Sequence, residues 1–421
     1  MTVRPYALFW GGLVAGCLCG TVATMAMLHK LPGIRSLRNL LPIAASAGKA
    51  AKAPAASRRE YAFGHDRHRD MMRNGLVSAS GSSPWQVRRG LDVERVAGGF
   101  TYPINLAFIE RPDPAPTAPQ FYVSELNGRL KYVANDGSVH LYADGLLNFT
   151  PILQEKSSET GISGLTTVPG SPDLIITRAS IDERSGLLTN EIVRLVSTAD
   201  GRSMVREVVI KRLEEFTSAS NQIQQVVFGP DGMLYVSVGD AENHRVSLDR
   251  GKFGGKILRM TAKGEPCDDN PWFAGSPSGT PGQYLFAIGL RNVFDFDFQP
   301  GTARLYGVDN GKNIDRFVEI RRGASYGWNG DFNSTRLNAL WTWGPGDNTA
   351  PVGMVFLDRP VLGNNSLGRC YVANYGPPGA MGETRGKSLW EFSVADDAGL
   401  LAATPTVILS YSGWTGLPWK S

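Results

Sequence analysis

The sequence from about Leu91 onward predicts an all-β fold, because of its strand pattern and its turns. Apolar runs of four to seven residues recur between turn residues, as in 121–146, where Asn-Gly and Asn-Asp-Gly separate three expected strands. No helical crossovers interrupt these hairpins, and about 330 residues exceed a single sandwich, which favours a barrel or a propeller. Turn-marked hairpins spaced by roughly 45 to 60 residues predict a six-bladed β-propeller.

The first 28 residues have a different character. The run Ala7–Leu28 holds no charged residue over 22 positions, enough for a helix to cross a hydrocarbon core of about 30 Å. We therefore expect 1–28 to be a signal anchor whose transmembrane helix contacts the membrane through residues 7–28. A cleaved signal peptide and an organelle transit sequence are the alternatives, because an acid-free stretch rich in Ala and Arg follows the run.

The next segment and the distribution of charge set the remaining boundaries. Residues 29–90 lack a sustained apolar period and predict a linker of low order, which assigns 91–421 to the propeller. Residues 1–59 hold eight basic residues and no acid, so that of 43 basic residues 35 remain beyond them, against all 39 acidic residues. The net charge of +4 therefore belongs to the leader. No broad basic face is expected on the body, which argues against nucleic acid as a partner.

The four cysteines predict neither a disulfide framework nor a zinc site. Cys17 and Cys19 lie in the apolar run, and Cys267 and Cys370 stand alone in the body. One bridge between the latter two and two unpaired buried thiols are both compatible with this spacing.

The stretch 221–240 is the clearest hairpin, with two apolar strands on either side of a Gly-Pro-Asp-Gly turn. Together with three other blocks it resembles the glucose/sorbosone dehydrogenase family. The blocks occur in order as YPINLAF (102–108), NQIQQVVFGPDGMLYVSVGD (221–240), GGKILRMTAKGEPCDDNPWF (254–273), and GLRN and SYGWNG within 285–330. The resemblance implies a six-bladed propeller that oxidises sugars with pyrroloquinoline quinone and calcium.

The resemblance implies a proton-accepting histidine at the position of Asn221. A carboxamide has no usable basicity near neutral pH, so the catalytic base is expected to be degraded. Asp240 matches the carboxylate that orients the family histidine. Two substitutes for the base are considered. His244 can swing into the pocket from its loop, and Asp240 can itself accept the proton if burial raises its pKa.

The cofactor positions implied by the resemblance match only in part. Arg291 and Asn292 match the pair that holds the quinone through its carboxylates and carbonyls, a planar role that suits Arg. Phe294 stands where the family has a glutamine. Further cofactor contacts are expected at Glu159, Arg385 and Lys387. A later basic pair and the terminal hairpin of the family are missing, so the last blade is expected to be incomplete.

The calcium loop is also altered. The resemblance implies a calcium site that uses the backbone carbonyls of a Gly-Pro pair, which places metal-site residues at Asp309, Gly311 and Lys312, with Lys312 in place of the proline. A cation beside a calcium site is unfavourable, although Asp309 and Asp315 can compensate for it.

We therefore expect an aldose dehydrogenase-like oxidoreductase that uses pyrroloquinoline quinone, with a small sugar as substrate and a degraded base. The alternative is an inactive, membrane-tethered propeller that serves as a binding or scaffold module, with a protein partner at an open blade edge. A third hypothesis is a calcium-dependent lactonase with Asn221, Asn292 and Asp240 as ligands. The resemblance places the propeller outside the cytosol, extracytoplasmic or lumenal, whereas the Lys/Arg excess after the run argues for the opposite orientation. Cleavage would instead give a secreted or organellar protein.

Overall fold

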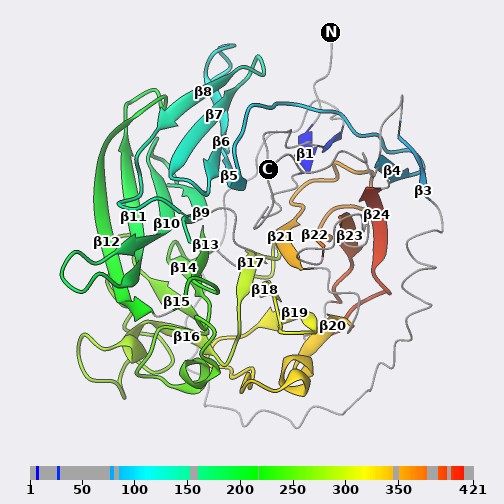
Figure 1. Cartoon of the computed structure of the whole chain (residues 1–421). Helices are drawn as coiled ribbons and strands as arrows, with labels where there is room; N and C mark the ends of the chain where they lie inside the picture. Colours follow the sequence, from blue (N-terminus) through cyan, green and yellow to red (C-terminus); the bar gives the residue numbers. More distant parts are fainter. Residues whose placement is uncertain are drawn as a thin grey trace, which may run out of the picture.

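The computed structural model describes 6–8, 26–28, 76–79, 85–151, 160–216, 218–344, 350–376, 387–395 and 400–411. Within these residues the chain forms five antiparallel sheets of at least four strands, arranged as blades around a common centre (Figure 1). The all-β propeller expected from the sequence is confirmed.

Each blade is built from strands that are consecutive in the sequence. The first holds β5 (Pro103–Phe108), β6 (Pro119–Glu125), β7 (Arg129–Ala134) and β8 (Val139–Ala143). The second holds β9 (Ile162–Thr167), β10 (Leu174–Ile181), β11 (Leu188–Ser197) and β12 (Met204–Phe216). The third holds β13 (Ile223–Phe228), β14 (Leu234–Val238), β15 (Lys256–Met260) and β16 (Leu285–Ile288).

The last two blades follow the same plan. The fourth holds β17 (Val293–Phe298), β18 (Leu305–Asp309), β19 (Asp315–Ile320) and β20 (Ala339–Trp343). The fifth holds β21 (Pro351–Phe356), β22 (Cys370–Asn374), β23 (Ser388–Phe392) and β24 (Thr406–Tyr411), extended by β4 (Trp85–Arg88) and β3 (Leu76–Ser78). Short 3-10 helices occur in the connections as η1 (His244–Leu248), η2 (Pro281–Tyr284) and η3 (Phe332–Arg336).

The first strand of each blade lies innermost, and β5, β9, β13, β17 and β21 contact one another in this order. All five inner strands are six residues long, and each shifts its register with the second strand just after its first residue. Such a bulge increases the local twist and re-aims side chains. The aligned sequences are PINLAF, ISGLTT, IQQVVF, VFDFDF and PVGMVF. The inner strands are therefore one repeated unit that differs mainly in its polar residues.

The described residues form five blades rather than the six expected. The expectation assumed about 55 residues for each blade. The third blade is longer because the connection between β15 and β16 contains η2, so that this blade extends from Ile223 to Ile288. The extra length lies in connections and not in a further sheet of the described chain.

The segment before the first blade joins the two ends of the blade series. Strand β4 pairs with the edge strand β24, with Trp85 opposite Tyr411. The chain then crosses to the first blade, as Figure 1 shows. Leu91 and Val93 pack against the fifth blade, whereas Phe100 packs against the first. The fifth blade, expected to be incomplete and open at its edge, thus has four strands of its own and an outer edge covered by β4 and β3.

The N-terminal run is described only at its ends. Strands β1 (Tyr6–Leu8) and β2 (Ala26–Leu28) pair antiparallel, with Tyr6 opposite Leu28, and the residues between them lie outside the described part. No helix in the described ranges is long and apolar enough to cross a membrane. Of the expected linker 29–90, residues 76–79 and 85–90 are described, and they contain β3 and β4.

Apolar side chains fill the spaces between neighbouring blades. The interface of the fourth and fifth blades is rich in aromatic residues, with Trp343 5.8 Å from Phe392 and Phe317 4.7 Å from Phe392 between ring centroids. Cys267 and Cys370 are both buried and unbridged, which settles the choice that the sequence left open. This packing fixes the inner strands and the loops at their N-terminal ends.

Candidate functional site

Loops of the third and fourth blades meet at the N-terminal ends of β13 and β17. The backbone N–H of Asp240 donates to the carbonyl of Arg291 at 2.8 Å, and that of Asn310 donates to Asn292 at 2.9 Å. The backbone N–H of Trp328 donates to Gly289 at 2.9 Å, which adds the loop 325–330. Segments that are distant in the sequence are thereby fixed to one another. We call Asn221, Asp240, Arg291, Asn292 and Trp328 the candidate site.

Asn221 is held directly against Asp240. Its Nδ2 donates to Asp240 Oδ1 at 2.7 Å, and both side chains are buried, with exposed fractions of 3% and 1%. Asn221 has a φ of +52°, a left-handed conformation that Asn tolerates better than most residues. The close approach depends on Gly239, since a Cβ there would lie 2.3 Å from the Asn221 carbonyl oxygen and 2.7 Å from Asn292 Oδ1. The ends of the 221–240 hairpin are therefore part of one buried polar cluster.

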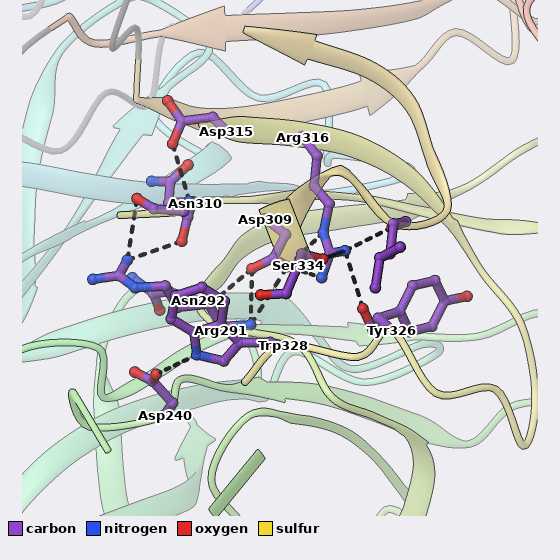
Figure 2. Close-up of polar contacts among 12 residues, drawn as sticks. Asp240, Arg291, Asn292, Asp309, Asn310, Asp315, Arg316, Tyr326, Trp328 and Ser334 are labelled. Atoms are coloured by element: carbon purple, nitrogen blue, oxygen red, sulfur yellow. Dashed lines mark hydrogen bonds and ion pairs between the residues drawn. The ribbon is translucent and has the colours of Figure 1, made fainter. Parts of the chain in front are cut away.

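Trp328 supplies the other partner of Asp240, and the sequence analysis did not assign it a role. Its Nε1 donates to Asp240 Oδ2 at 2.8 Å, as Figure 2 shows, while Oδ1 also accepts the backbone N–H of Glu242. The SYGWNG block contained the only available hint. Both oxygens of Asp240 thus accept hydrogen bonds, two at Oδ1 and one at Oδ2, which leaves Oδ2 with the remaining accepting capacity of the carboxylate.

His244 lies outside this cluster. It is exposed, it begins η1, and its ring lies against the backbone of Gly330, where a Cβ would lie 2.9 Å from His244 Cγ. No contact between His244 and Asp240 occurs among the described residues. Its use as a base would require η1 to rearrange.

Asn292 and Arg291 are anchored through their backbone. Asp309 Oδ1 accepts the N–H of Asn292 at 2.8 Å and that of Arg291 at 3.1 Å. The half-buried guanidinium of Arg291 points the other way, with Nη1 donating to the carbonyls of Asn310 at 2.9 Å and Gly311 at 3.5 Å. It lies 6.0 Å from the Trp328 ring centroid. Arg291 therefore links the loop that contains Asn310 and Gly311, where calcium was expected, to Asp240 and its partners.

Asp309 forms a fully buried ion pair with Arg316. Arg316 Nη2 and Nε donate to Asp309 Oδ2 at 2.7 and 2.9 Å, and neither side chain is exposed. The two residues are cross-strand partners in β18 and β19, and Arg316 Nη1 also donates to the Leu337 carbonyl at 2.8 Å. Asp309, which we expected as a metal ligand, thus has both oxygens occupied by N–H donors.

The other residues of the expected calcium loop are arranged as follows. Lys312 is exposed, and Gly311 makes a turn so close that a Cβ would lie 1.9 Å from the Ile314 carbonyl oxygen. Asp315 accepts the backbone N–H groups of Gly311 and Ala350, both at 3.1 Å. Burial raises the pKa of Asp315 to about 7. No group of three His, Cys, Asp or Glu residues in the described ranges is placed to hold a metal ion.

Three expected cofactor contacts remain. Glu159 and Arg385 lie outside the described residues. Lys387 precedes β23 in the fifth blade, where burial lowers the pKa of its ammonium group, which lies 5.7 Å from the Tyr411 ring centroid. No contact among the described residues connects Lys387 with Arg291.

An apolar cluster lies on the axis beside the candidate site. Ile104, Phe294 and Val352, each the second residue of its inner strand, pack together with Leu126. Phe294 replaces the glutamine implied by the resemblance, so this part of the site offers a flat apolar contact instead of hydrogen bonds.

The C-terminal halves of the inner strands surround a channel cavity of about 200 Å³, lined by residues of all five strands, including Gln225, Asp295 and Asp297. Asp295 accepts from Gln225 Nε2 at 2.9 Å and from the backbone N–H of Met354 at 2.8 Å. Burial raises the pKa of Asp295 to about 7 and that of Asp297 to about 6, against the lowering effect of these hydrogen bonds. The channel cavity is separated along the axis from the candidate site.

Comparison with known proteins identifies the family. The sequence model of the family "Glucose / Sorbosone dehydrogenase" matches residues 101–344, which are more than half of the chain. The chain belongs to the glucose/sorbosone dehydrogenase family. The family expected from the four sequence blocks is thus confirmed.

Relatives with assigned names agree with this membership. The aldose sugar dehydrogenase YliI of Escherichia coli is 26% identical over 137 residues, which cover 32% of this chain and 33% of the relative. The quinoprotein glucose dehydrogenase B of Acinetobacter calcoaceticus is 26% identical over 132 residues, 27% of this chain and 26% of the relative. The matched segment therefore spans about a third or less of these dehydrogenases, and their activity does not transfer directly.

Solved structures show the same propeller. The PQQ-bound aldose sugar dehydrogenase of Streptomyces coelicolor superposes with a TM-score of 0.56 at 23% identity and covers 77% of this chain and 84% of that one. A putative oxidoreductase (glucose dehydrogenase) of Thermus thermophilus gives 0.57 at 26% identity, with 78% and 88% covered. The fold of the family members is thus the fold of this chain.

Proposed function

We propose that this chain is an oxidoreductase of the sugar dehydrogenase type that binds pyrroloquinoline quinone and an aldose at the candidate site, with an impaired proton-accepting step. The observation that carries the proposal is the contact of Asp240 with Arg291. This contact is a backbone hydrogen bond from the Asp240 N–H to the Arg291 carbonyl at 2.8 Å, and it places the segments that carry the remains of the catalytic pair and the expected cofactor pair side by side. Family membership supports the reaction class.

The residues present fit the quinone in part. Arg291 uses Nη1 on two carbonyls, and its Nε and Nη2 donate to none of the described residues. That edge of the guanidinium has the planar fork that a carboxylate prefers. Phe294 belongs to a buried apolar cluster, so a quinone ring would contact it only along its small exposed edge. When bound, the quinone would supply the acceptor for the hydride that leaves the sugar.

The proton is the difficulty for this site. Oxidation of an aldose at its anomeric carbon also requires that the hydroxyl proton be taken up, and Asn221 stands where the base is expected. A carboxamide oxygen can accept a hydrogen bond from that hydroxyl and orient it, but cannot take the proton. We therefore infer tight binding with slow turnover.

The decisive experiment restores the base. The purified chain is incubated with pyrroloquinoline quinone and calcium and desalted, and dye reduction is followed with a set of aldoses. We expect Asn221→His to raise the rate by about 10²-fold or more, because a positioned general base contributes roughly that factor. Adding Asp240→Asn to Asn221→His should abolish the gain, since the imidazole then loses its orienting carboxylate. Loss of quinone absorbance on desalting, with no dye reduction in any variant, would disprove the proposal.

The second candidate is a propeller that binds ligand without redox turnover. Asn221 favours it, because the residue buried at the base position lacks basicity. Retained quinone or sugar binding together with an unchanged, negligible rate in Asn221→His would select this candidate.

The calcium ion implied by the resemblance does not fit the residues present. The guanidinium of Arg291 lies against the carbonyls of Asn310 and Gly311, Lys312 stands at the second position of the implied carbonyl pair, and Asp309 and Asp315 accept from N–H donors at both oxygens. Calcium requires six to eight oxygen ligands with available lone pairs. We therefore assign no step of the reaction to calcium.

We further propose that residues 7–28 tether the protein to a membrane, with the propeller on the extracytoplasmic or lumenal side. The uncharged run of 22 residues supports the tether. Fractionation of the full chain against a variant lacking 7–28 tests it. We expect only the full chain to resist extraction with carbonate, and equal extraction of both would disprove the tether. Protease accessibility of the propeller in intact cells reports its side.

A further inference from the structure

Two backbone carbonyls of the loop that follows β18 converge on a positive charge supplied by the protein itself. Arg291 Nη1 donates to the carbonyl oxygens of Asn310 at 2.9 Å and Gly311 at 3.5 Å. Carbonyl oxygens that converge in a turn are ligands typical of a hard divalent cation. A guanidinium group lies here at hydrogen-bonding distance from the same oxygens, as Figure 2 shows for Asn310.

The surrounding charges also disfavour a second cation. Asp309, the carboxylate next in sequence, is neutralised by the buried guanidinium of Arg316 at 2.7 Å. Lys312, the next residue after Gly311, adds a positive charge on the exposed side of the loop. A divalent ion placed at the two carbonyls would therefore meet Arg291 within direct contact and Lys312 nearby, and the remaining carboxylate of the loop, Asp315, is already held by the backbone N–H groups of Gly311 and Ala350.

We propose that the guanidinium of Arg291 takes the place of the divalent cation, so that the site binds its planar, carboxylate-bearing quinone without a metal ion. This inference rests on the proposed function. A guanidinium with a single positive charge then stands where a divalent ion would bind. Such a group favours ligands that carry carboxylates, because a carboxylate can accept a bidentate hydrogen bond from it.

The shape of the guanidinium allows both tasks at once. Its Nη1 donates to the carbonyls of the loop, and its Nε and Nη2 donate to none of the described residues. The backbone from which it extends is held, because the Arg291 N–H donates to Asp309, which in turn accepts from Arg316. Trp328, at 6.0 Å from the guanidinium carbon, covers one side of the group. Arg291 thus forms a bridge between backbone and ligand.

The first test measures binding of pyrroloquinoline quinone to the full chain by quenching of tryptophan fluorescence. Titrations are run with EDTA and with millimolar calcium. We expect dissociation constants that agree within about twofold, because no metal contributes. Calcium-dependent tightening by tenfold or more would overturn the inference and leave the proposed function intact. No binding under either condition would overturn both.

A second test needs no quinone. Calcium is titrated into the full chain in a calorimeter, and thermal unfolding is recorded with and without it. We expect no saturable heat and no shift of Tm. Saturable binding that is lost in Asp315→Asn would place calcium in this loop and overturn the inference.

Variants then show which charge acts. Arg291→Ala frees the two carbonyls, and we expect metal-free quinone affinity to fall at least tenfold and to recover in part with calcium. Lys312→Gln is the matched control, because it removes an adjacent exposed charge but leaves Arg291 in place. It should leave affinity and calcium independence unchanged. If Lys312→Gln alone makes binding calcium-dependent, Lys312 excludes the metal and the role assigned to Arg291 is wrong. Equal unfolding midpoints of the variants verify that they fold.

Discussion

Carboxylates occur at two levels of the same axis, and the protein satisfies them in different ways. At the candidate site, Asp240 accepts from the side chains of Asn221 and Trp328, which lie 19 and 88 positions away. In the channel, Asp295 and Asp297 accept from the backbone N–H groups of Met354 and Phe356 on the next inner strand, at 2.8 and 2.7 Å. The first arrangement depends mainly on individual side chains, with one backbone N–H from Glu242, whereas the second depends mainly on backbone N–H groups of the neighbouring blade, with one side-chain donor from Gln225.

This difference separates what the family fold requires from what this chain has changed. The side chains of Asp295 and Asp297, two residues apart on β17, accept hydrogen bonds from backbone N–H groups of β21. Any inner strand whose N–H groups point toward the neighbouring blade could donate in this way. The candidate site instead contains the substitution at Asn221 and a chain of donors from Trp328 to Arg316 that no other blade repeats among the described residues. Changes of function are therefore expected to concentrate at the N-terminal ends of the inner strands, where loops carry the side chains.

The largest effect is expected at the ion pair that supports the candidate site. Asp309→Asn keeps the shape of the side chain but leaves the buried charge of Arg316 without its partner, which should lower the free energy of unfolding by about 3–5 kcal/mol. Urea denaturation measures it. Asp144→Asn is the control, because Asp144 pairs with Arg129 at 2.9 Å with both side chains about half exposed. That change should cost less than about 1 kcal/mol. Equal losses would show that Asp309 is not a special support.

The channel carboxylates predict a dependence of stability on pH. The folded-state pKa of Asp295, about 7, exceeds the value of about 3.9 for an unfolded aspartate. Between these values the folded protein binds more protons than the unfolded chain, so this contribution to stability is full below about pH 4 and is lost as the pH rises to 7. Asp297, with a pKa of about 6, acts in the same direction.

Asp295→Asn tests this sign. In the wild type, the free energy of unfolding should fall between pH 4 and pH 8, and in the variant this fall should be smaller by up to about 4 kcal/mol. This value is an upper bound, because the channel admits water. Urea denaturation at a series of pH values gives the two curves. The exposed control Asp144→Asn should run parallel to wild type. An Asp295→Asn curve that also runs parallel would mean that Asp295 ionises normally in the folded protein.

The features that depend on residues close together in the sequence were predicted well. The hairpin 221–240 appears as β13 and β14 around the expected turn, because its strands and turn are specified by neighbouring residues. Asn221, Asp240, Arg291 and Asn292 lie together as the family resemblance implied. The Asp309–Arg316 pair was missed, although the short hairpin between β18 and β19 places these residues opposite one another and its register could have indicated it.

The pairing between strands that are far apart in the sequence could not be predicted from the sequence pattern. The pairing of Trp85 with Tyr411 joins residues at opposite ends of the described chain, and nothing local to either strand specifies it. The blade count differed because connections such as that between β15 and β16 lengthen the blades, and polar positions such as Asn105, Gln225 and Asp295 vary and obscure the repeat. The hydrogen bond from Trp328 to Asp240 likewise depends on how two separate loops pack.

The smallest predicted effect isolates that last hydrogen bond. Trp328→Phe removes the Nε1 donor at 2.8 Å from Asp240 Oδ2, whereas Trp343→Phe removes an indole N–H that is buried without a partner. Both tryptophans are almost fully buried and both variants lose a similar volume, so the packing costs should nearly cancel in the comparison. Trp328→Phe should therefore be less stable than Trp343→Phe by about 1–3 kcal/mol, because it leaves a buried carboxylate oxygen unsatisfied. Urea denaturation of both proteins measures the difference, and equal stabilities would mean that Trp328 acts on Asp240 through packing alone.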